Sequence, residues 1–171
     1  MRITDILSMF IDDITFRTEV LPGDDLIVRE IVESTGFFYD IEIPVAVDLV
    51  TERLLEGYDS GYYFIFAETE GKTTAYSCFG PIAGSDGSYD LYWIVTHNDF
   101  RGKGIGKALL EETHRRVQEM SGRLIIAETS TLEKYHPTRH FYEQNGYVLE
   151  AIIRDFYKPG DGKAIYIKRF P

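Results

Sequence analysis

The sequence predicts one α+β domain in which a mixed, mostly antiparallel, twisted sheet is flanked by helices. Three observations lead to this fold class. The chain has 171 residues, of which 44% are hydrophobic and 27% are charged, as expected for a single domain with a sizeable core. Strand-like and helix-like periodicities follow one another in the order β-α-α-β-β-β-α-β-α-β-β. No repeat or linker divides residues 13–171, which we assign to the domain, with residues 1–12 as an N-terminal appendage.

In the first third of the chain, two helices are expected to follow a short strand. Residues 14–21 alternate as in a strand, and Pro22–Asp24 provides a turn and a helix cap. Apolar residues at helical spacing then predict a helix that ends at Thr35-Gly36. A second helix is predicted over 42–56, because the pattern stops at Gly57. Its inward face is expected to consist of Val45, Leu49, Leu54 and Leu55.

The middle of the chain is expected to form three strands and a long helix. Residues 62–68 and 73–79 flank a Glu70-Gly71 turn, which is typical of a hairpin. A further strand covers 89–96. An amphipathic helix then begins near residue 105, because one stripe of mostly apolar residues is opposed by charged residues.

The last third is predicted to form a strand, a helix and two more strands. These elements cover 124–128, Pro137 to Gly146, 147–153 and 164–168. We expect residues 165–167 to lie in an exposed end strand, which would permit a homodimer by strand pairing.

The most informative local feature is the loop that opens the long helix, Arg101-Gly102-Lys103-Gly104-Ile105-Gly106-Lys107. Its three glycines allow the backbone to approach a ligand closely, because no Cβ atom intervenes. A helix that starts in this loop directs unpaired N–H groups and the positive end of its dipole toward the loop. Three basic side chains add full charges. The loop is therefore predicted to bind phosphate, and most naturally a pyrophosphate.

Two common phosphate-binding loops do not fit this segment. A P-loop requires glycine where Arg101 stands and a hydroxyl residue where Ala108 stands. The dinucleotide fingerprint requires its last glycine at Lys107. What remains is the pattern R-x-x-G-x-G, formed by Arg101, Gly104 and Gly106.

Composition limits the partners and the compartment. The net charge of −10 argues against a nucleic-acid partner and is compatible with a cationic substrate. No segment is apolar enough to span a membrane, so no membrane partner is expected. The single cysteine, Cys78, fits a reducing compartment, and we expect the protein to be cytoplasmic. Cys78 is expected to be a buried apolar residue rather than an acyl-carrying nucleophile.

The R-x-x-G-x-G pattern resembles the acyl-CoA-binding loop of the GNAT superfamily of N-acetyltransferases, and the element order also matches that fold. A second segment, Arg139-His140-Phe141-Tyr142-Glu143-Gln144-Asn145-Gly146-Tyr147, is similar to the family pattern R-x-F-Y-x-x-x-G-[FY]. The resemblance runs from about Ile14 to Phe170 and is strongest from Tyr89 to Tyr147. It implies a domain that uses acetyl-CoA as co-substrate.

The resemblance also implies which residues hold acetyl-CoA. The backbone of the loop from Arg101 to Lys107 would bind the pyrophosphate. The pantetheine arm would pair with the strand before the loop, near Trp93, Ile94 and Val95. Phe141 and Tyr142 belong to the second family segment, in which the tyrosine faces the CoA sulfur.

Three residues are candidates for the chemistry. Tyr142 can protonate or hydrogen-bond the thiolate that leaves when an amine attacks a thioester. It can equally be a core tyrosine packed beside Phe141 and Tyr147. Asp90, on the strand before the loop, is a candidate general base, and Glu128 at the end of the next strand is the alternative. Both carboxylates can also be ordinary strand-end groups that face solvent.

The acceptor is not identified by the sequence. Phe37, Phe38 and Tyr39 lie between the two early helices, which the resemblance places beside the acceptor pocket. Aromatic faces suit a cationic or apolar amine, and they suit core packing equally well. Four further tyrosines can add to this pocket, namely Tyr62, Tyr63, Tyr76 and Tyr135.

The sequence therefore predicts an acetyl-CoA-dependent N-acetyltransferase that acts on a primary amine of a small molecule or peptide, by direct attack in a ternary complex. The alternative is a module of the same fold that binds acetyl-CoA without turnover. A metal site at His136 and His140 is not expected, since no third ligand is evident.

Overall fold

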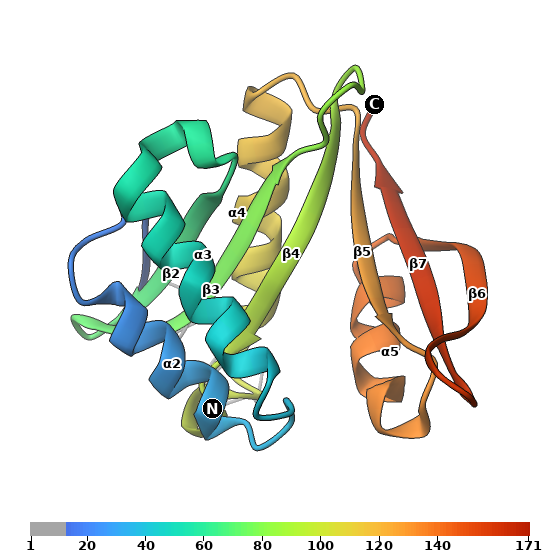
Figure 1. Cartoon of the computed structure of the whole chain (residues 1–171). Helices are drawn as coiled ribbons and strands as arrows, with labels where there is room; N and C mark the ends of the chain where they lie inside the picture. The colour runs from blue at the N-terminus through green and yellow to red at the C-terminus, as the bar shows by residue number, and fades with distance from the viewer. Residues whose placement is uncertain (1–12) are drawn as a thin grey trace, which may run out of the picture. The chain divides into compact units, whose positions relative to one another are not determined.

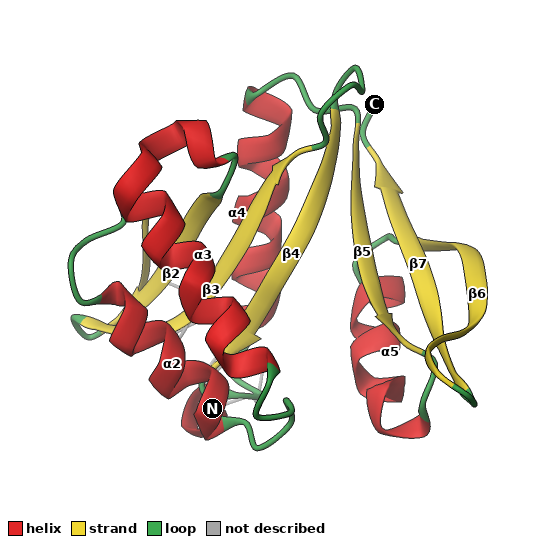
Figure 2. Cartoon of the chain, viewed as in Figure 1, coloured by secondary structure: helices red, strands yellow, loops and turns green. Residues whose placement is uncertain are grey.

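A computed structural model of the chain describes residues 13–171, and the N-terminal appendage predicted for residues 1–12 lies outside them (Figure 1). Within the described residues the predicted element order is confirmed, with three short 3₁₀ turns added. The strands are β1 (Ile14–Arg17), β2 (Tyr63–Thr69), β3 (Lys72–Pro81), β4 (Ser88–Thr96), β5 (Leu124–Ser130), β6 (Val148–Lys158) and β7 (Asp161–Arg169). The helices are α2 (Asp24–Ser34), α3 (Glu42–Glu56), α4 (Ile105–Glu119) and α5 (His136–Gln144) (Figure 2).

The predicted α+β class with a mixed, mostly antiparallel sheet is confirmed. In the part of the chain that the structure describes, the hydrogen-bonded strand order is β1-β2-β3-β4-β5-β7-β6. The β4–β5 pair is parallel, whereas β1–β2, β2–β3, β5–β7 and β6–β7 are antiparallel. The described chain forms two compact units, and the first contains residues 13–80 together with Trp93–Thr113. The second contains Pro81–Tyr92 and His114–Pro171, so β4 and α4 contribute to both.

The core of the first unit forms where α2 and α3 cover one face of its strands (Figure 1). Tyr76 and Cys78, two residues apart on β3, face these helices, as the period of a strand requires. Between them, Ser77 points to the other face, where its hydroxyl lies 2.9 Å from the Thr113 hydroxyl on α4. Cys78 is buried, as predicted, and burial raises the pKa of its thiol well above the ordinary value.

Most of the residues predicted to form the inward face of α3 do not face inward. Leu55 is 80% exposed, and Val45 and Leu54 are also exposed. The helix instead buries Ala46 and Val50, with Leu49 packed beside them as predicted. The small residue at position 46 marks the true contact stripe, since a short side chain lets the helix approach the sheet closely. Sequence reasoning that selects the largest apolar residues misses this stripe.

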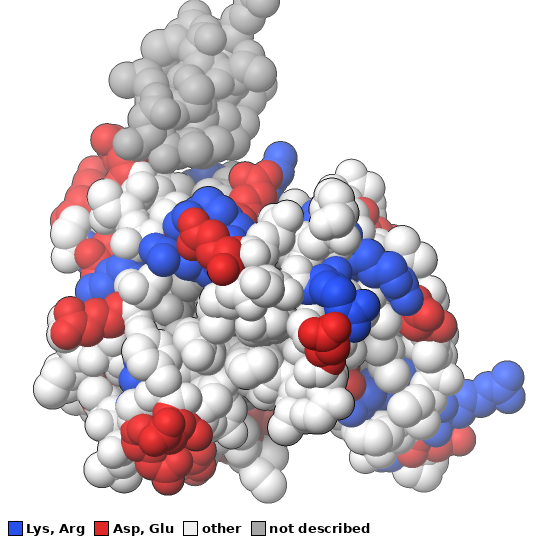
Figure 3. All heavy atoms as spheres, turned by 90° about the horizontal axis from the view of Figure 1, so that it is seen from above, with Lys and Arg blue, Asp and Glu red and all other residues white. Residues whose placement is uncertain are grey.

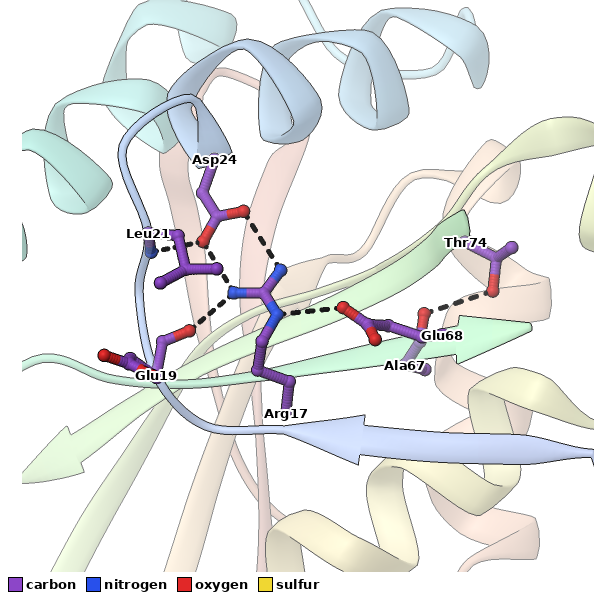
Figure 4. Close-up of polar contacts among 7 residues, drawn as sticks. All are labelled: Arg17, Glu19, Leu21, Asp24, Ala67, Glu68 and Thr74. Atoms are coloured by element: carbon purple, nitrogen blue, oxygen red, sulfur yellow. Dashed lines mark hydrogen bonds and ion pairs between the residues drawn. The ribbon is translucent and has the colours of Figure 1, made fainter. Parts of the chain in front are cut away.

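A partly buried ionic cluster joins β1, β2 and the start of α2 (Figure 4). The Arg17 guanidinium donates two hydrogen bonds to the Asp24 carboxylate, at 2.8 and 3.0 Å, and one to Glu68 at 2.8 Å. Asp24 also accepts a hydrogen bond from the Leu21 backbone N–H at 2.7 Å. The helix cap predicted at Pro22–Asp24 therefore takes another form, with Gly23 at the N-cap position and the carboxylate holding the preceding turn.

We expect Asp24→Ala to lower the free energy of unfolding by about 3 kcal/mol, because it leaves a half-buried guanidinium with one carboxylate partner fewer. Asp25→Ala is the matched control, since it also removes a carboxylate from the first turn of α2. The control should lose less than about 1 kcal/mol. Urea unfolding of the two variants measures the difference, and equal losses would contradict this account of the cluster.

In the second unit, α5 covers one face of β5 and β7. Tyr166 and Ala164 on β7 are buried, and the Tyr166 hydroxyl donates a hydrogen bond to Glu143 of α5 at 2.8 Å. Lys163 and Ile165 alternate with these residues, so they lie on the opposite face of the sheet.

The end strand of the sheet is β6, and the prediction that residues 165–167 lie in an end strand is wrong. β7 pairs with β5 on one side and with β6 on the other, so it is an interior strand. Chain order did not reveal this, because the last strand inserts between two earlier ones. All eleven residues of β6 are exposed.

Charge is dispersed on the face of the molecule drawn in Figure 3, where acidic and basic side chains occur in small separate groups with uncharged surface between them. Among the described residues, no helix is long and apolar enough to cross a membrane.

Candidate functional site

The glycine loop has the backbone geometry of a ligand-binding turn. A short turn, Asn98–Phe100, follows β4, and the Phe100 N–H donates to the His97 carbonyl at 2.9 Å. Gly102 and Gly104 then adopt left-handed conformations, with φ of 74° and 82°. Helix α4 begins at the next residue, and the Ala108 N–H donates to the Gly104 carbonyl at 3.0 Å. The N–H groups of the first turn of α4 therefore point into the loop without intrahelical partners.

Three basic residues lie in or beside this turn in the sequence, and their side chains have different surroundings. Arg101 is exposed. The Lys103 ammonium lies 4.9 Å from the centre of the Phe100 ring. The Lys107 ammonium lies 3.8 Å from Glu111, one helical turn further on. A Cβ atom placed on Gly102 would meet nothing within 4 Å, so the loop leaves room for a group to approach its backbone. These features fit a pyrophosphate.

The aromatic residues predicted at the acceptor side lie against a residue predicted to hold pantetheine. The Phe38 ring is 5.1 Å from the Trp93 ring on β4, and the Phe37 ring is 5.6 Å from Phe38. Tyr39 is exposed, and its backbone N–H donates to Glu42 at 2.7 Å. All of these residues belong to the first unit.

The β4 residues predicted to bind pantetheine lie beyond the ladder that joins β4 to β5. That ladder runs from the pair Ser88–Leu124 to the pair Leu91–Ala127. Trp93, Ile94 and Val95 come after its last pair. The Val95 side chain is buried in the core of the first unit, so only the backbone of this residue would be available to a ligand.

Tyr142 lies on α5 in the second unit and is buried among aromatic rings. Its ring centre is 5.7 Å from Phe141, 5.2 Å from Tyr147 and 6.0 Å from Tyr166. Burial raises the pKa of its hydroxyl, so the group carries its proton at neutral pH. The packing alternative stated for Tyr142 is thus present in the structure, and it leaves the hydroxyl a proton donor.

A histidine that sequence reasoning did not single out supports this aromatic cluster. His114 on α4 is buried, and its Nε2 lies 2.9 Å from the Tyr147 hydroxyl. Burial, aided by the charge of Lys168, lowers the pKa of His114 to about 4. A lone histidine on a helix carries no sequence signal that distinguishes this role.

We expect the pKa of His114 to make stability pH-dependent. The unfolded chain binds a proton at this site below about pH 6.5, whereas the folded chain does so only below about 4. The free energy of unfolding should therefore fall by about 2–3 kcal/mol as the pH decreases from 6.5 to 4, and this loss should be absent in His114→Gln. Urea unfolding across this range tests the prediction, and an equal pH dependence in both proteins would contradict it.

The two candidate general bases lie on one face of the second unit, together with a lysine that was not predicted. Asp90 pairs with Ile126 and Glu128 pairs with Ile165, so both carboxylates point away from α5. Glu128 Oε2 lies 2.5 Å from the Lys163 ammonium. The pKa of Asp90 is raised by burial and by the charge of Glu128, and Lys163 partly opposes this rise.

Of the remaining candidates, Tyr76 is fully buried, and its hydroxyl has no hydrogen-bond partner among the described residues. Tyr76 therefore belongs to the core and does not line an acceptor pocket. The rings of His136 and His140 stack 6.3 Å apart on α5. Within residues 13–171, no group of three or more potential metal ligands is found.

Comparison with known proteins gives the family. The model of the acetyltransferase (GNAT) domain matches residues 60–149. A GNAT-family protein from Desulfovibrio desulfuricans is 46% identical, with 91% of this chain and 98% of that chain covered and a TM-score of 0.89. None of the curated proteins compared with the chain matches it.

Two more distant structures share the fold. The ribosomal-protein-S18-alanine N-acetyltransferase from Escherichia coli is 16% identical, covering 91% of this chain and 93% of its own, with a TM-score of 0.71. A GNAT family acetyltransferase from Elizabethkingia anophelis, solved with acetyl-CoA bound, is 12% identical, covering 93% and 99%, with a TM-score of 0.66. The family model and the 46% identity together show that this chain belongs to the GNAT family of acetyltransferases.

Proposed function

We propose that this protein is an acetyl-CoA-dependent N-acetyltransferase that acetylates a primary amine by direct attack within a ternary complex. The observation that carries the proposal is the turn at Gly102 and Gly104, which leads directly into the first turn of α4 in a segment with three basic residues. Such a turn offers backbone donors to a pyrophosphate, and acetyl-CoA would supply an activated acetyl thioester there.

The residues of this chain would manage the protons of the transfer. A primary amine with a pKa near 10.4 is almost entirely protonated at neutral pH, so a carboxylate must first remove a proton. The free amine then forms a C–N bond to the acetyl carbon as the C–S bond breaks. The sulfur leaves as a thiolate, which takes a proton from the Tyr142 hydroxyl or a hydrogen bond from it. The nitrogen then loses its second proton to give the neutral amide; this proton passes to the Tyr142 phenolate if Tyr142 has protonated the sulfur, and to water otherwise.

Asp90 is the favoured base, because its burial and the nearby Glu128 raise its pKa toward the working pH. We expect kcat/KM to rise with pH through the pKa of Asp90, since only the ionised carboxylate accepts a proton. Asp90→Asn should remove this rise, and Glu128→Gln should move it to lower pH by lowering the pKa of Asp90. An unchanged pH–rate profile in Asp90→Asn would transfer the role to Glu128.

The function is tested by calorimetric titration with acetyl-CoA, followed by a screen of primary amines for release of free CoA thiol. Binding that requires the pyrophosphate, together with amine-dependent thiol release, is the expected result. Binding without turnover on any amine would favour a module that only senses acetyl-CoA. No binding at millimolar acetyl-CoA would overturn the proposal.

A further inference from the structure

A lysine ammonium of this chain occupies a cage formed by one carboxylate and two aromatic rings. The Lys163 ammonium lies 2.5 Å from Glu128 Oε2 and 3.8 Å from the centre of the Phe156 ring. The Tyr157 ring is 6.0 Å away. Aromatic faces and a carboxylate attract cations by independent electrostatic effects, so together they recognise an ammonium group. We call Glu128, Phe156 and Tyr157 the ammonium cage.

The sheet register builds this cage in the second unit. Lys163 pairs with Ser130 on β5 and with Ile153 on β6. The β6–β7 register shifts between Ile153 and Lys158, so the intervening residues leave the regular ladder. Within this irregular segment Asp155 has a φ of 52°, and the Phe156 and Tyr157 rings meet edge to face at 4.9 Å. The irregular segment thus supplies the rings, and β5 supplies the carboxylate.

The cage is open on its outer side although its interior is filled. The Lys163 side chain is 15% exposed, whereas that of Glu128 is 43% exposed. Phe156 and Tyr157 are 48% and 49% exposed. A ligand can therefore reach all three residues of the cage from solvent. An acceptor ammonium that takes the place of the Lys163 ammonium keeps a cation beside Glu128, so the exchange leaves this carboxylate paired.

We infer that the ammonium cage binds the cationic head of the acceptor and that Lys163 is an internal competitor which the acceptor displaces. This inference rests on the proposed function and deepens it, because it names the acceptor class as a primary alkylammonium compound. The cage offers nothing comparable to an anionic acceptor, whose charge Glu128 would repel.

The position of Asp90 connects the cage to the reaction. Asp90 lies half-buried on the same sheet face, and both Glu128 and Lys163 influence its ionisation. An acceptor ammonium that replaces the Lys163 ammonium would come within the electrostatic reach of the candidate base. The cage would hold the acceptor on the sheet face that carries Asp90.

Binding of n-butylammonium tests the inference without acetyl-CoA. If Lys163 fills the cage about nine-tenths of the time, Lys163→Ala should bind n-butylammonium about tenfold more tightly than the unaltered protein. Lys163→Arg keeps a cation in the cage and should bind like the unaltered protein. Lys158→Ala is the matched control, since it removes a lysine from the same hairpin outside the cage. Adding Glu128→Gln to Lys163→Ala should abolish the gain.

Dissociation constants from NMR titration decide the outcome, with Lys163→Gln as a second variant if Lys163→Ala does not fold. Equal affinities in the unaltered protein and in Lys163→Ala or Lys163→Gln would overturn the inference. If these variants gain affinity while no amine is ever acetylated, the proposed function fails and the cage stands. If amines are acetylated while these variants gain nothing, the function stands and the inference fails.

Discussion

Replacing Tyr142 by phenylalanine should lower kcat by about 10²–10³-fold and leave the dissociation constant of acetyl-CoA unchanged. The proposed chemistry uses only the phenolic proton, and phenylalanine keeps the ring that packs against Tyr147 and Tyr166. Burial keeps this hydroxyl protonated at any pH at which the enzyme would work. Steady-state kinetics with the best amine of the screen, combined with calorimetry for acetyl-CoA, measures both quantities.

Tyr166→Phe provides the control for this substitution. It removes a hydroxyl from the same aromatic cluster, and it breaks the hydrogen bond to Glu143. We expect it to lower the free energy of unfolding by about 1 kcal/mol and to leave kcat unchanged. If Tyr142→Phe retained the original kcat, Tyr142 would be a packing residue and another group would protonate the thiolate.

The elements and the loop were predictable because their signals are local. The turn at Glu70-Gly71, the start of α4 after the glycines and the proline near the start of α5 each lie within a few residues of the structure they specify. The prediction that this loop binds phosphate likewise rests on adjacent residues. Sequence reasoning therefore identified the element order and a complete candidate loop.

Features that depend on tertiary contacts were not predictable in the same way. The buried stripe of α3 depends on which face meets the sheet, and the sequence offered larger apolar residues on the wrong side. The insertion of β7 between β5 and β6 depends on strand pairing. Lys163 meets Glu128 only because β5 and β7 are neighbours in a particular register. Each outcome is set by residues far apart in the chain.

The candidate site also combines features with local signals and features set by tertiary contacts. The sequence offered Asp90 as a base, but the ordinary pKa of an aspartate is unfavourably low for this role, and the sequence did not show which groups would raise that pKa. The structure supplies burial, Glu128 and the opposing Lys163. His114 and its contact with Tyr147 were missed, because the two residues are brought together only by the docking of α4 in the second unit.

Replacing Gly106 by leucine should weaken acetyl-CoA binding by at least about 100-fold, since a bulky side chain in the first turn of α4 would fill space that the loop offers to the pyrophosphate. Gly106 lies inside α4, where leucine is a better helix former than glycine. The free energy of unfolding should therefore stay constant or rise by up to about 1 kcal/mol. Loss of binding together with retained stability would separate a ligand role from an architectural one. Calorimetric titration and urea unfolding of the same preparation supply the two measurements.

Gln118→Leu is the control for added bulk, because it places the same side chain at an exposed position of α4 far from its first turn. It should bind acetyl-CoA like the unaltered protein. Gly104 is a poorer test, since its φ of 82° would strain any larger residue and mix a folding defect with a binding defect. If Gly106→Leu bound acetyl-CoA normally, the first turn of α4 would not contact the ligand. The basic residues of the loop would then have to account for its affinity by charge alone, which raising the salt concentration would reveal as a steep loss of binding.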